Sequence, residues 1–260
     1  MRPLVILSGV GLASIYGFLL APLVVVVLSS LTAGELMRFP PQGVSLRWFS
    51  RFYESAGFID ALLLSLRVAA VSTVVVTLVG GMAALCHRTL SRRLGGWFRL
   101  LLLLPLLIPE LLTAIGLLFF LSRIGLGKSL IGLQLGHIVI TLPFAFISIA
   151  AALQQVDPAL EDASDSLGAS GWQTFRHILL PLIKAGALMG ALFAFVTSFD
   201  MFTLSFLLKP VGGDTLPLAL FNYLTYDFDP TAAAAATISI LLAFAGVWVI
   251  DRTVGLRRVM

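Results

Sequence analysis

The fold of this chain is organised around one polar stretch in an otherwise apolar sequence, Asp157-Pro158-Ala159-Leu160-Glu161-Asp162-Ala163-Ser164-Asp165-Ser166-Leu167-Gly168-Ala169-Ser170-Gly171-Trp172. The stretch continues through Ile178-Leu179-Leu180-Pro181 to Gly186, and it holds four of the thirteen acidic residues. We therefore expect it to lie outside the bilayer, between two membrane spans.

Capping signals divide this stretch into two short helices. Asp157 is an N-cap candidate, and a proline follows it at the first helical position. Ser170 is a second N-cap candidate, and Gln173 three residues later completes a capping box. Gly168 and Gly171 lie between the two helix starts, where a turn needs them. The pattern predicts two helices joined by a tight bend.

The composition is that of an integral membrane protein. Of the 260 residues, 59% are hydrophobic and only 12% are charged, whereas a soluble domain carries about 25% charged residues. A formal net charge of +4 raises the possibility of nucleic-acid binding, but the arginines cluster at the ends of apolar runs, which favours membrane anchoring. The single cysteine, Cys86, excludes an intrachain disulfide and a multi-cysteine metal site.

Apolar runs of about 20 residues, the length that crosses a bilayer, recur along the chain. The first run is too long for a signal peptide and has no clear cleavage site, so we interpret it as a retained span. Residues 46–53 mix aromatic side chains with arginines, which suits a short amphipathic helix at the membrane interface. One transmembrane domain, residues 1–260, is expected, with spans at about 4–31, 61–86, 98–121, 130–153, 185–208 and 231–250.

The distribution of basic residues predicts the orientation of these spans. Six spans place both termini on one side, together with the loop at 87–97 and the polar stretch at 157–181. Ten arginines and lysines fall on that side, against six, or seven with Arg67, on the other. Because basic loops stay inside, both termini and the polar stretch are expected in the cytoplasm.

Ionisable residues inside spans are costly and so mark candidate functional sites. Glu110 is expected near mid-membrane in the third span, and Asp200 in the outer half of the fifth. His137 lies inside the fourth span. These three residues are the candidates for a water-filled translocation path that attracts cations. Alternatively, each is neutral or satisfied by a neighbouring helix or by backbone freed at prolines.

The polar stretch resembles the EAA loop of the inner-membrane permease subunits of bacterial ABC importers. That motif reads Glu-Ala-Ala, three residues, Gly, nine residues, Ile-x-Leu-Pro. Here Asp162-Ala163-Ser164, Gly168 and Ile178-Leu179-Leu180-Pro181 stand at the same spacing, with Asp in place of Glu and Ser in place of the second Ala. The resemblance implies a coupling helix that docks on an ATPase subunit through Glu161, Asp162, Ala163, Ser164, Leu167, Gly168, Ala169, Trp172, Ile178 and Pro181. The two acidic residues would pair there with basic groups of the ATPase.

Ser198-Phe199-Asp200-Met201-Phe202 and Gly212-Gly213-Asp214-Thr215-Leu216-Pro217 are similar to the corresponding regions of permeases in the polyamine, opine and aminophosphonate branch. The resemblance implies the all-α type I importer fold, in the bacterial inner membrane. Its implied partners are two ATPase subunits, a second and different permease subunit and a periplasmic binding protein. No G-x-x-x-x-G-K-[ST] P-loop occurs, so ATP and Mg would be bound by the ATPase partners, and this chain needs no cofactor and is not itself an enzyme.

Several alternatives remain open at the level of sequence. The solute is expected to be a small cationic amine, or instead an aminophosphonate, an opine, an amino-acid-like molecule or a metal complex. An ion-driven secondary transporter and a non-transporting assembly protein are further alternatives. Gly168-Ala169-Ser170-Gly171 also resembles the nucleophile motif of intramembrane proteases, but Ser170 is accounted for as a helix cap in a charged loop.

Overall fold

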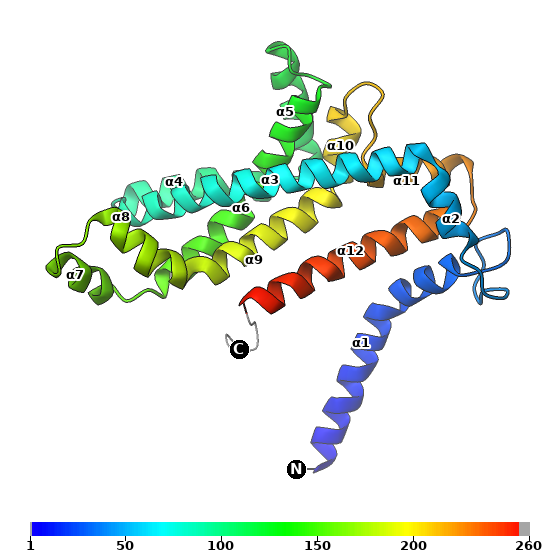
Figure 1. The fold of residues 1–260 in the computed structure, drawn as a ribbon, viewed down its shortest axis with the longest axis horizontal. Helices are drawn as coiled ribbons and strands as arrows, with labels where there is room; N and C mark the ends of the chain where they lie inside the picture. The colour runs from blue at the N-terminus through cyan, green and yellow to red at the C-terminus, as the bar shows by residue number, and fades with distance from the viewer. Residues whose placement is uncertain (1, 255–260) are drawn as a thin grey trace. The chain divides into compact units, whose positions relative to one another are not determined.

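The computed structural model describes residues 2–254, and within that range the chain is helical with no strand (Figure 1). The helices are α1 (Arg2–Ser30), α2 (Arg47–Glu54), α3 (Ala56–Thr89), α4 (Arg92–Leu107), α5 (Glu110–Arg123), α6 (Leu130–Gln154), α7 (Ala159–Ser166), α8 (Gly171–Thr174), the π-helix η1 (Phe175–Leu179), α9 (Leu180–Phe199), α10 (Phe202–Leu208), α11 (Leu216–Tyr226) and α12 (Thr231–Val254). The all-α fold expected from the sequence is confirmed.

Hydropathy and helix length together support the predicted spans. Five helical segments of the described chain are long and apolar enough to cross a bilayer, and a sixth is obtained if the bent pair α4 and α5 counts as one span. The predicted spans at 4–31, 61–86, 130–153 and 231–250 correspond to α1, α3, α6 and α12. Over most of these helices the expected boundaries differ from the observed ones by only a few residues.

The span expected at 98–121, with Pro105 and Pro109 inside it, corresponds to a pair of helices, α4 and α5, which are bent by 102° at Ile108 and Pro109. Proline lacks an amide donor and pushes the residue before it out of the helical region. Ile108 is indeed extended, with a ψ of 136°. Pro105 lies inside α4 without ending it. The second proline therefore determines where the direction of the chain changes.

The predicted span at 185–208 is shifted relative to the observed helix. The segment from Gly171 to Phe199 is continuously helical and passes from the polar stretch directly into the apolar run. It includes the π-helix Phe175–Leu179. Pro181 has no amide hydrogen and cannot bond to the carbonyl four residues earlier, which lies within the π-helix. The regular α-helical hydrogen bonds are therefore interrupted where the wider π-turn occurs. The helix then breaks at Asp200 and Met201, and α10 follows.

Helix α11 was not predicted, because its sequence lies between the expected spans at 185–208 and 231–250. At 11 residues it is about 16 Å long and cannot cross a bilayer. Its start is fixed by a buried hydrogen bond of 2.8 Å from the Leu216 amide to the Ser65 hydroxyl in α3. This long-range contact has no local signature in the sequence.

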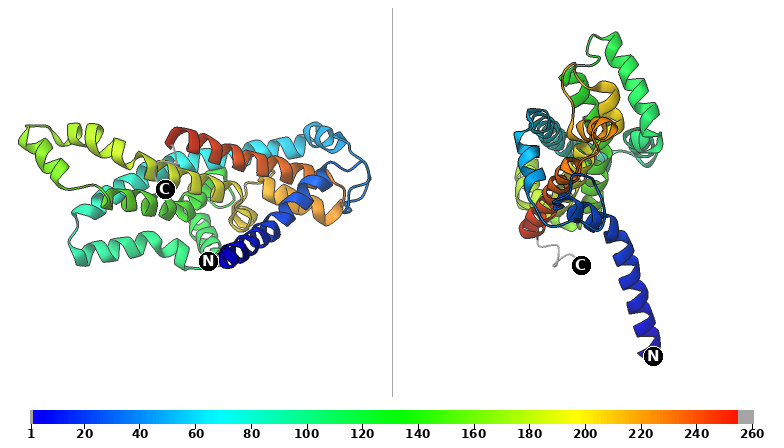
Figure 2. Two further views of the ribbon diagram at one scale, coloured as in Figure 1. Left: turned by 90° about the horizontal axis from the view of Figure 1, so that it is seen from below. Right: turned by 90° about the vertical axis from the view of Figure 1, so that its right-hand side faces the viewer.

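The chain divides into two compact units, and the larger one contains Asp60–Leu218 and Phe244–Met260. Within it, α6 and α9 lie side by side in each view (Figure 2). Two glycines of α9 allow this close approach. A Cβ at Gly186 would lie 2.6 Å from the Cβ of Ala152, and one at Gly190 would lie 2.8 Å from the Cα of Ala145. Contacts this short show that the two helices pack backbone to backbone.

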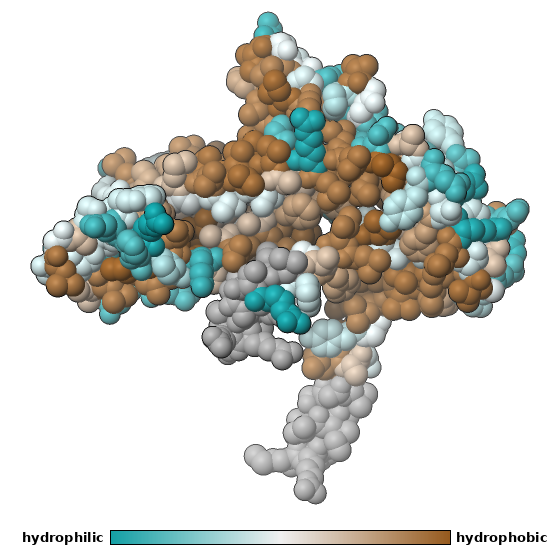
Figure 3. Space-filling view, in the orientation of Figure 1, coloured by the Kyte–Doolittle hydropathy of each residue, from teal (hydrophilic) through white to brown (hydrophobic). Residues whose placement is uncertain are grey.

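Apolar side chains from α3, α5, α6 and α10 form one buried cluster of this unit, made of Val68, Ala114, Leu121, Leu133, Ile140, Met201, Leu204 and Leu208. A second cluster, nearer to α7, joins α3, α6 and the helix 171–199 through Ala84, Phe146, Ile149, Leu153, Val156, Leu179 and Ile183. Hydrophobic residues also cover much of the visible surface, whereas hydrophilic residues gather around α7 and around α2 (Figure 3). Such a surface suits lipid or protein partners over the helices and water around α7.

The smaller unit contains Met1–Ile59 and Ala219–Ala243. The predicted amphipathic helix at residues 46–53 is confirmed as α2, which buries Trp48 and Phe52. The Trp48 indole donates a hydrogen bond of 2.8 Å to the carbonyl of Thr32. An ion pair of 2.9 Å joins Arg51 to Asp229. These contacts tie the segment after α1 to the segment before α12.

Candidate coupling and translocation sites

The polar stretch forms the predicted pair of helices, α7 and α8. The Asp157 carboxylate accepts a hydrogen bond of 3.0 Å from the Ala159 amide at the start of α7. Ser170 and Gln173 form the complete capping box that the sequence predicts. Because both helix starts are satisfied locally, the geometry of the bend is determined within this stretch.

Gly168 makes the bend between α7 and α8. Its φ is +77°, in the left-handed region that favours glycine, and an added Cβ would meet no atom within 4 Å. The requirement for glycine is therefore one of backbone conformation and not of space. Two large apolar side chains flank the bend in solvent, since Leu167 is 88% exposed and Trp172 is 65% exposed. Apolar groups presented this way on a polar segment suit a partner's groove.

Ser164 explains one departure from the EAA pattern. The side chain is buried, and its hydroxyl lies 2.8 Å from the hydroxyl of Thr174 in α8. An alanine at this position would leave the buried Thr174 hydroxyl with one partner fewer. Ser164 thus joins the two helices to each other. We had expected its side chain to face a partner instead.

Glu161, which we expect from the sequence to pair with a basic group of an ATPase, also has a partner within the chain. Its carboxylate forms an ion pair with Arg88 at the end of α3, 73 residues away. Both side chains are partly exposed. Asp162, the next residue, is exposed and belongs to none of the ion pairs found in residues 2–254. Asp162 is therefore the carboxylate available to a partner, whereas Glu161 connects α7 to α3.

The other residues predicted for coupling differ in exposure. Ala163 and Pro181 are exposed, and Ala169 and Ile178 are half-buried. A small hollow of about 290 Å³ lies beside the bend. Its lining comprises Ser164, Leu167, Gly168, Ala169, Gln173, His177 and Ile178. The hollow is the concave surface that the two helices make together.

Asp200 lies at a break in the helical path, which the sequence did not predict. Helix α9 ends at Phe199, Asp200 caps it, and Met201 is extended before α10 begins. The Asp200 side chain is on the exposed surface, and the ion pairs of the described residues do not include it. A carboxylate at the end of an apolar helix of 20 residues is costly in lipid, so its position calls for a functional explanation.

Glu110 is the first residue of α5, directly after the bend at Pro109, and its side chain is exposed. Ala114, one turn further along α5, and Met201, next to Asp200, belong to the same buried cluster. Both carboxylates thus occur at helix breaks around one core. Among residues 2–254, however, no hydrogen bond or ion pair joins Glu110 to Asp200.

His137 is buried, with 1% of its surface exposed. It therefore does not line an open path, and it corresponds to the alternative in which a neighbouring helix satisfies the ring. Its Nδ1 atom lies 2.8 Å from the hydroxyl of Ser198, and its Nε2 atom lies 3.3 Å from the hydroxyl of Ser205. These serines belong to α9 and α10, on either side of the break. The ring therefore contacts both helix ends that meet at Asp200.

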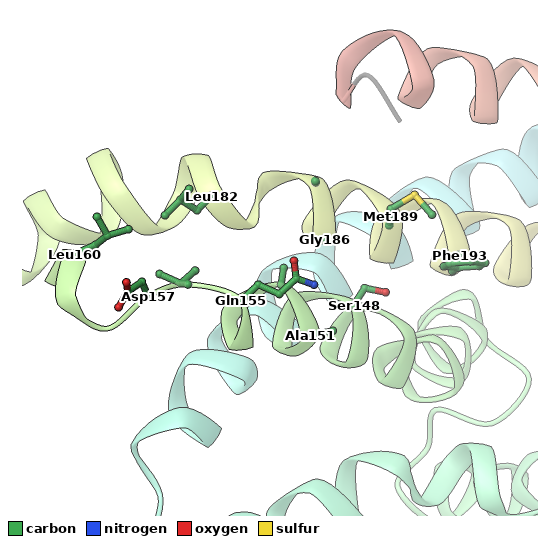
Figure 4. Close-up of a pocket in the computed structure, with 12 residues that line it drawn as sticks. Ser148, Ala151, Gln155, Asp157, Leu160, Leu182, Gly186, Met189 and Phe193 are labelled. Atoms are coloured by element: carbon green, nitrogen blue, oxygen red, sulfur yellow. The ribbon is translucent and has the colours of Figure 1, made fainter. Parts of the chain in front are cut away.

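A groove of about 630 Å³ between α6 and α9 was also not predicted (Figure 4). Ser148 of α6 and Gln155, the residue that follows α6, line one wall, and Met189 and Phe193 of α9 line the other. Asp157 lies at the end of the groove nearest α7. The lining residues of α9 lie on one helix face, because most of them recur every three or four positions: Leu182, Ala185, Gly186, Met189 and Phe193. That periodicity is the signal in the sequence from which the groove wall was predictable.

Comparison with known proteins agrees with these features. The family model described as binding-protein-dependent transport system inner membrane component matches residues 76–254. The spermidine/putrescine transport system permease protein PotC of Haemophilus influenzae is 27% identical over 231 residues, covering 89% of this chain and 90% of the relative. The putative 2-aminoethylphosphonate transport system permease protein PhnV of Salmonella typhimurium is 29% identical over 223 residues, covering 85% and 83%.

Two solved structures share the fold. A chain of a bacterial ABC transporter involved in the import of the acidic polysaccharide alginate superposes with a TM-score of 0.75 at 18% identity. The match covers 97% of this chain and 95% of that one. A chain of the MetNI methionine ABC transporter, in inward-facing conformations, gives a TM-score of 0.63 at 18% identity, over 82% and 99% of the two chains.

Membrane spans, a polar helix pair set between two of them and broken helices bearing carboxylates define a membrane transport subunit. The chain belongs to the binding-protein-dependent transport system inner membrane component family. It is the inner-membrane permease subunit of an ABC importer, with the type I importer fold, in the branch whose relatives are named for polyamines and aminophosphonates.

Proposed function

We propose that this permease forms half of the translocation path for a small cationic amine of the polyamine type, delivered by a periplasmic binding protein. The observation that carries the proposal is the exposed Asp200 carboxylate at the helix break, without an ion-pair partner among the described residues. An ammonium group is the natural counterion for such a carboxylate in a low-dielectric setting. The relatives named for spermidine and putrescine support the same class of solute.

The face of α9 gives this path a direction. Phe193 and Asp200 are seven residues apart, about two helical turns, so they project from the same side of α9. Phe193 lines the groove between α6 and α9, and this groove runs towards Asp157 (Figure 4). We place the solute first at Asp200, with Glu110 as a second carboxylate of the path, and then in the groove. The apolar walls of the groove suit the methylene chain of a polyamine.

Energy for transport comes from partners in this proposal. Two ATPase subunits, which bind ATP and Mg, dock on the bend between α7 and α8. Leu167 and Trp172 enter the partner's groove, and Asp162 meets its basic groups. A second, different permease subunit completes the path. Both termini lie in the cytoplasm together with α7 and α8, as the distribution of basic residues indicates.

A second class of solute is an aminophosphonate, since a relative of similar identity is named for 2-aminoethylphosphonate transport. Such a solute carries an ammonium group that would meet Asp200 in the same way. Its phosphonate would need a basic group, which the partner permease or Arg67 of α3 can supply. Opines, other amino-acid-like molecules and metal complexes are tested by the same competition experiment.

The experiment is uptake of labelled spermidine by the reconstituted importer, with unlabelled putrescine, aminoethylphosphonate, an opine, amino acids and a metal complex as competitors. Asp200→Asn and Glu110→Gln are compared with Asp227→Asn, which removes an exposed carboxylate from the loop between α11 and α12. Loss of a charged contact worth about 1.5–3 kcal/mol predicts a rise of roughly tenfold or more in the half-saturating concentration for Asp200→Asn. Wild-type uptake by Asp200→Asn would refute the proposed path.

A further inference from the structure

Three buried side chains form a bracket around the helix break at Asp200: His137 of α6, Ser198 of α9 and Ser205 of α10 (the 137–198–205 bracket). Each is less than 3% exposed. The imidazole connects to one serine through each ring nitrogen, at 2.8 and 3.3 Å. The path assigned above uses neither the ring nor the two hydroxyls, so their arrangement calls for its own explanation.

The hydrogen bonds determine which ring nitrogen carries the proton. The Ser205 hydroxyl donates its single hydrogen to the Met201 carbonyl at 2.6 Å. Towards Nε2 that oxygen can only accept, so Nε2 of the neutral ring is the protonated nitrogen. Nδ1 is then the acceptor, and Ser198 donates to it. Both ring nitrogens and both hydroxyls therefore have hydrogen-bond partners, as expected for a buried polar network that fixes one geometry.

Geometry shows that the bracket depends on the break. Seven residues of an unbroken helix would separate Ser198 and Ser205 by roughly 10.5 Å along the axis. A single imidazole making bonds of 2.8 and 3.3 Å cannot span that distance. The serines come within reach of one ring only because Asp200 and Met201 leave the helix. The ring in turn holds the last turn of α9 and the first turn of α10 in this arrangement.

The bracket is also tied to the backbone at the break. The Ser205 hydroxyl donates to the carbonyl of Met201, the N-cap residue of α10, in the bond to the residue four positions earlier that serine commonly makes within a helix. Packing fixes α6 at the same level, because a Cβ at Gly136 would lie 2.8 Å from both Leu204 and Leu208 of α10. The ring of the next residue, His137, is therefore held against the break.

We propose that His137 is a positioning residue that holds the break and thereby directs the Asp200 carboxylate into the translocation path. Asp200 lies between the two bracketed serines in the chain, so the angle between α9 and α10 sets the direction of its side chain. The proposal rests on the role of Asp200 stated above. It assigns His137 no contact with the solute.

The first test measures the accessibility of position 200 in the assembled importer. Cys86→Ser removes the only native cysteine, and Asp200→Cys introduces a single thiol. A positively charged methanethiosulfonate reagent then modifies this thiol with and without His137→Phe. Loss of both ring hydrogen bonds is expected to change the modification rate by about tenfold. His137→Gln, which keeps one donor and one acceptor, should restore part of the original rate.

The matched control is Thr141→Val, one turn further along α6. Thr141 is equally buried, but its hydroxyl bonds only to the carbonyl of His137 in its own helix. This variant should leave the modification rate unchanged. If His137→Phe does not assemble, Ser198→Ala makes the same test by removing a single hydroxyl of the bracket. A rate equal to wild type in an assembled His137→Phe or Ser198→Ala complex would overturn the proposal.

The second test separates this inference from the proposed function. In importers that keep Asp200, His137→Phe is expected to raise the spermidine concentration for half-maximal stimulation of ATP hydrolysis by about tenfold, with basal hydrolysis unchanged. If His137→Phe alters the modification rate but Asp200→Asn leaves transport intact, the path assignment fails and the bracket stands. If Asp200→Asn impairs transport but His137→Phe changes neither quantity, only the bracket fails.

Discussion

The bend at Gly168 provides the sharpest prediction for coupling. Its φ of +77° is disfavoured for every residue with a Cβ, yet the space around it is open. A substitution there changes backbone energy without causing a clash. Placing an L side chain in the left-handed region costs roughly 1–2 kcal/mol, with alanine near the lower end and the β-branched valine near the upper end. Asparagine tolerates this region best and should cost least.

These costs convert into a graded effect on the bend. Since 1.4 kcal/mol corresponds to tenfold, Gly168→Val is expected to shift the equilibrium away from the native bend by roughly twentyfold to thirtyfold. Gly168→Ala should shift it by about fivefold, and Gly168→Asn by less. The matched control is Gly171→Ala, because Gly171 lies in α8 without a positive φ and also has open space around it.

The assay is spermidine-stimulated ATP hydrolysis and uptake by the reconstituted importer, expressed as solute transported per ATP hydrolysed. The expected order of coupling is wild type, then Asn, then Ala, then Val, with Gly171→Ala close to wild type. Wild-type coupling in Gly168→Val would refute the reasoning that the bend transmits the ATPase movement. An equal loss in Gly171→Ala would show that any change in this segment is harmful and that φ is not the cause.

Three further predictions follow from other contacts. Arg88→Glu should lower the number of solute molecules transported per ATP, and the double variant Arg88→Glu/Glu161→Arg should restore it. The effect is expected to be small, because an ion pair between two partly exposed groups contributes less than about 1 kcal/mol. No recovery of the coupling ratio in the double variant would contradict a direct ion pair. Gly190→Ala should cost about 1–3 kcal/mol of stability, because its Cβ would meet α6 at 2.8 Å, whereas Gly116→Ala in α5 meets no atom within 4 Å; equal thermal stabilities in detergent would contradict this. Burial alone would raise the pKa of Asp229, but hydrogen bonds from Thr231 and Tyr223 and the charge of Arg51 outweigh it and lower that pKa. The stabilisation by the charged carboxylate is therefore fully present above about pH 4 and is lost as the pH falls through the lowered pKa. At pH 7 an Asp229→Asn variant should unfold at a lower temperature than the wild type, and equal unfolding temperatures would contradict the prediction.

The parts of this protein that were predictable from the sequence are those with local causes. Hydropathy alone located four of the six expected spans, those that correspond to α1, α3, α6 and α12, because each apolar run must be long enough to cross the bilayer. The capping box at Ser170 and the turn at Gly168 depend on residues at most a few positions away. Because the whole coupling loop is built from such local signals, its two helices were predictable.

Features that depend on tertiary contacts were not predictable. The bend at Pro109 had a local signal, but Pro105 gives the same signal and lies inside a helix. The break at Asp200 has no glycine or proline nearby, and it is held by His137, which bonds to Ser198 across 61 residues of sequence. The pairing of Glu161 with Arg88 likewise joins distant parts of the chain. A single sequence carries no record of which distant residues meet.

Cross-linking tests directly whether the exposed bend between α7 and α8 docks on an ATPase subunit. Leu167→Cys in a Cys86→Ser background places one thiol at the most exposed apolar side chain of the bend. After purification of the complex in mild detergent, a short bifunctional thiol-to-amine reagent is added and the products are identified by mass spectrometry. The account predicts a covalent product with an ATPase subunit, whose yield changes when ATP is bound. An intact complex that gives no such product, or a chain that purifies without any ATPase, would contradict it.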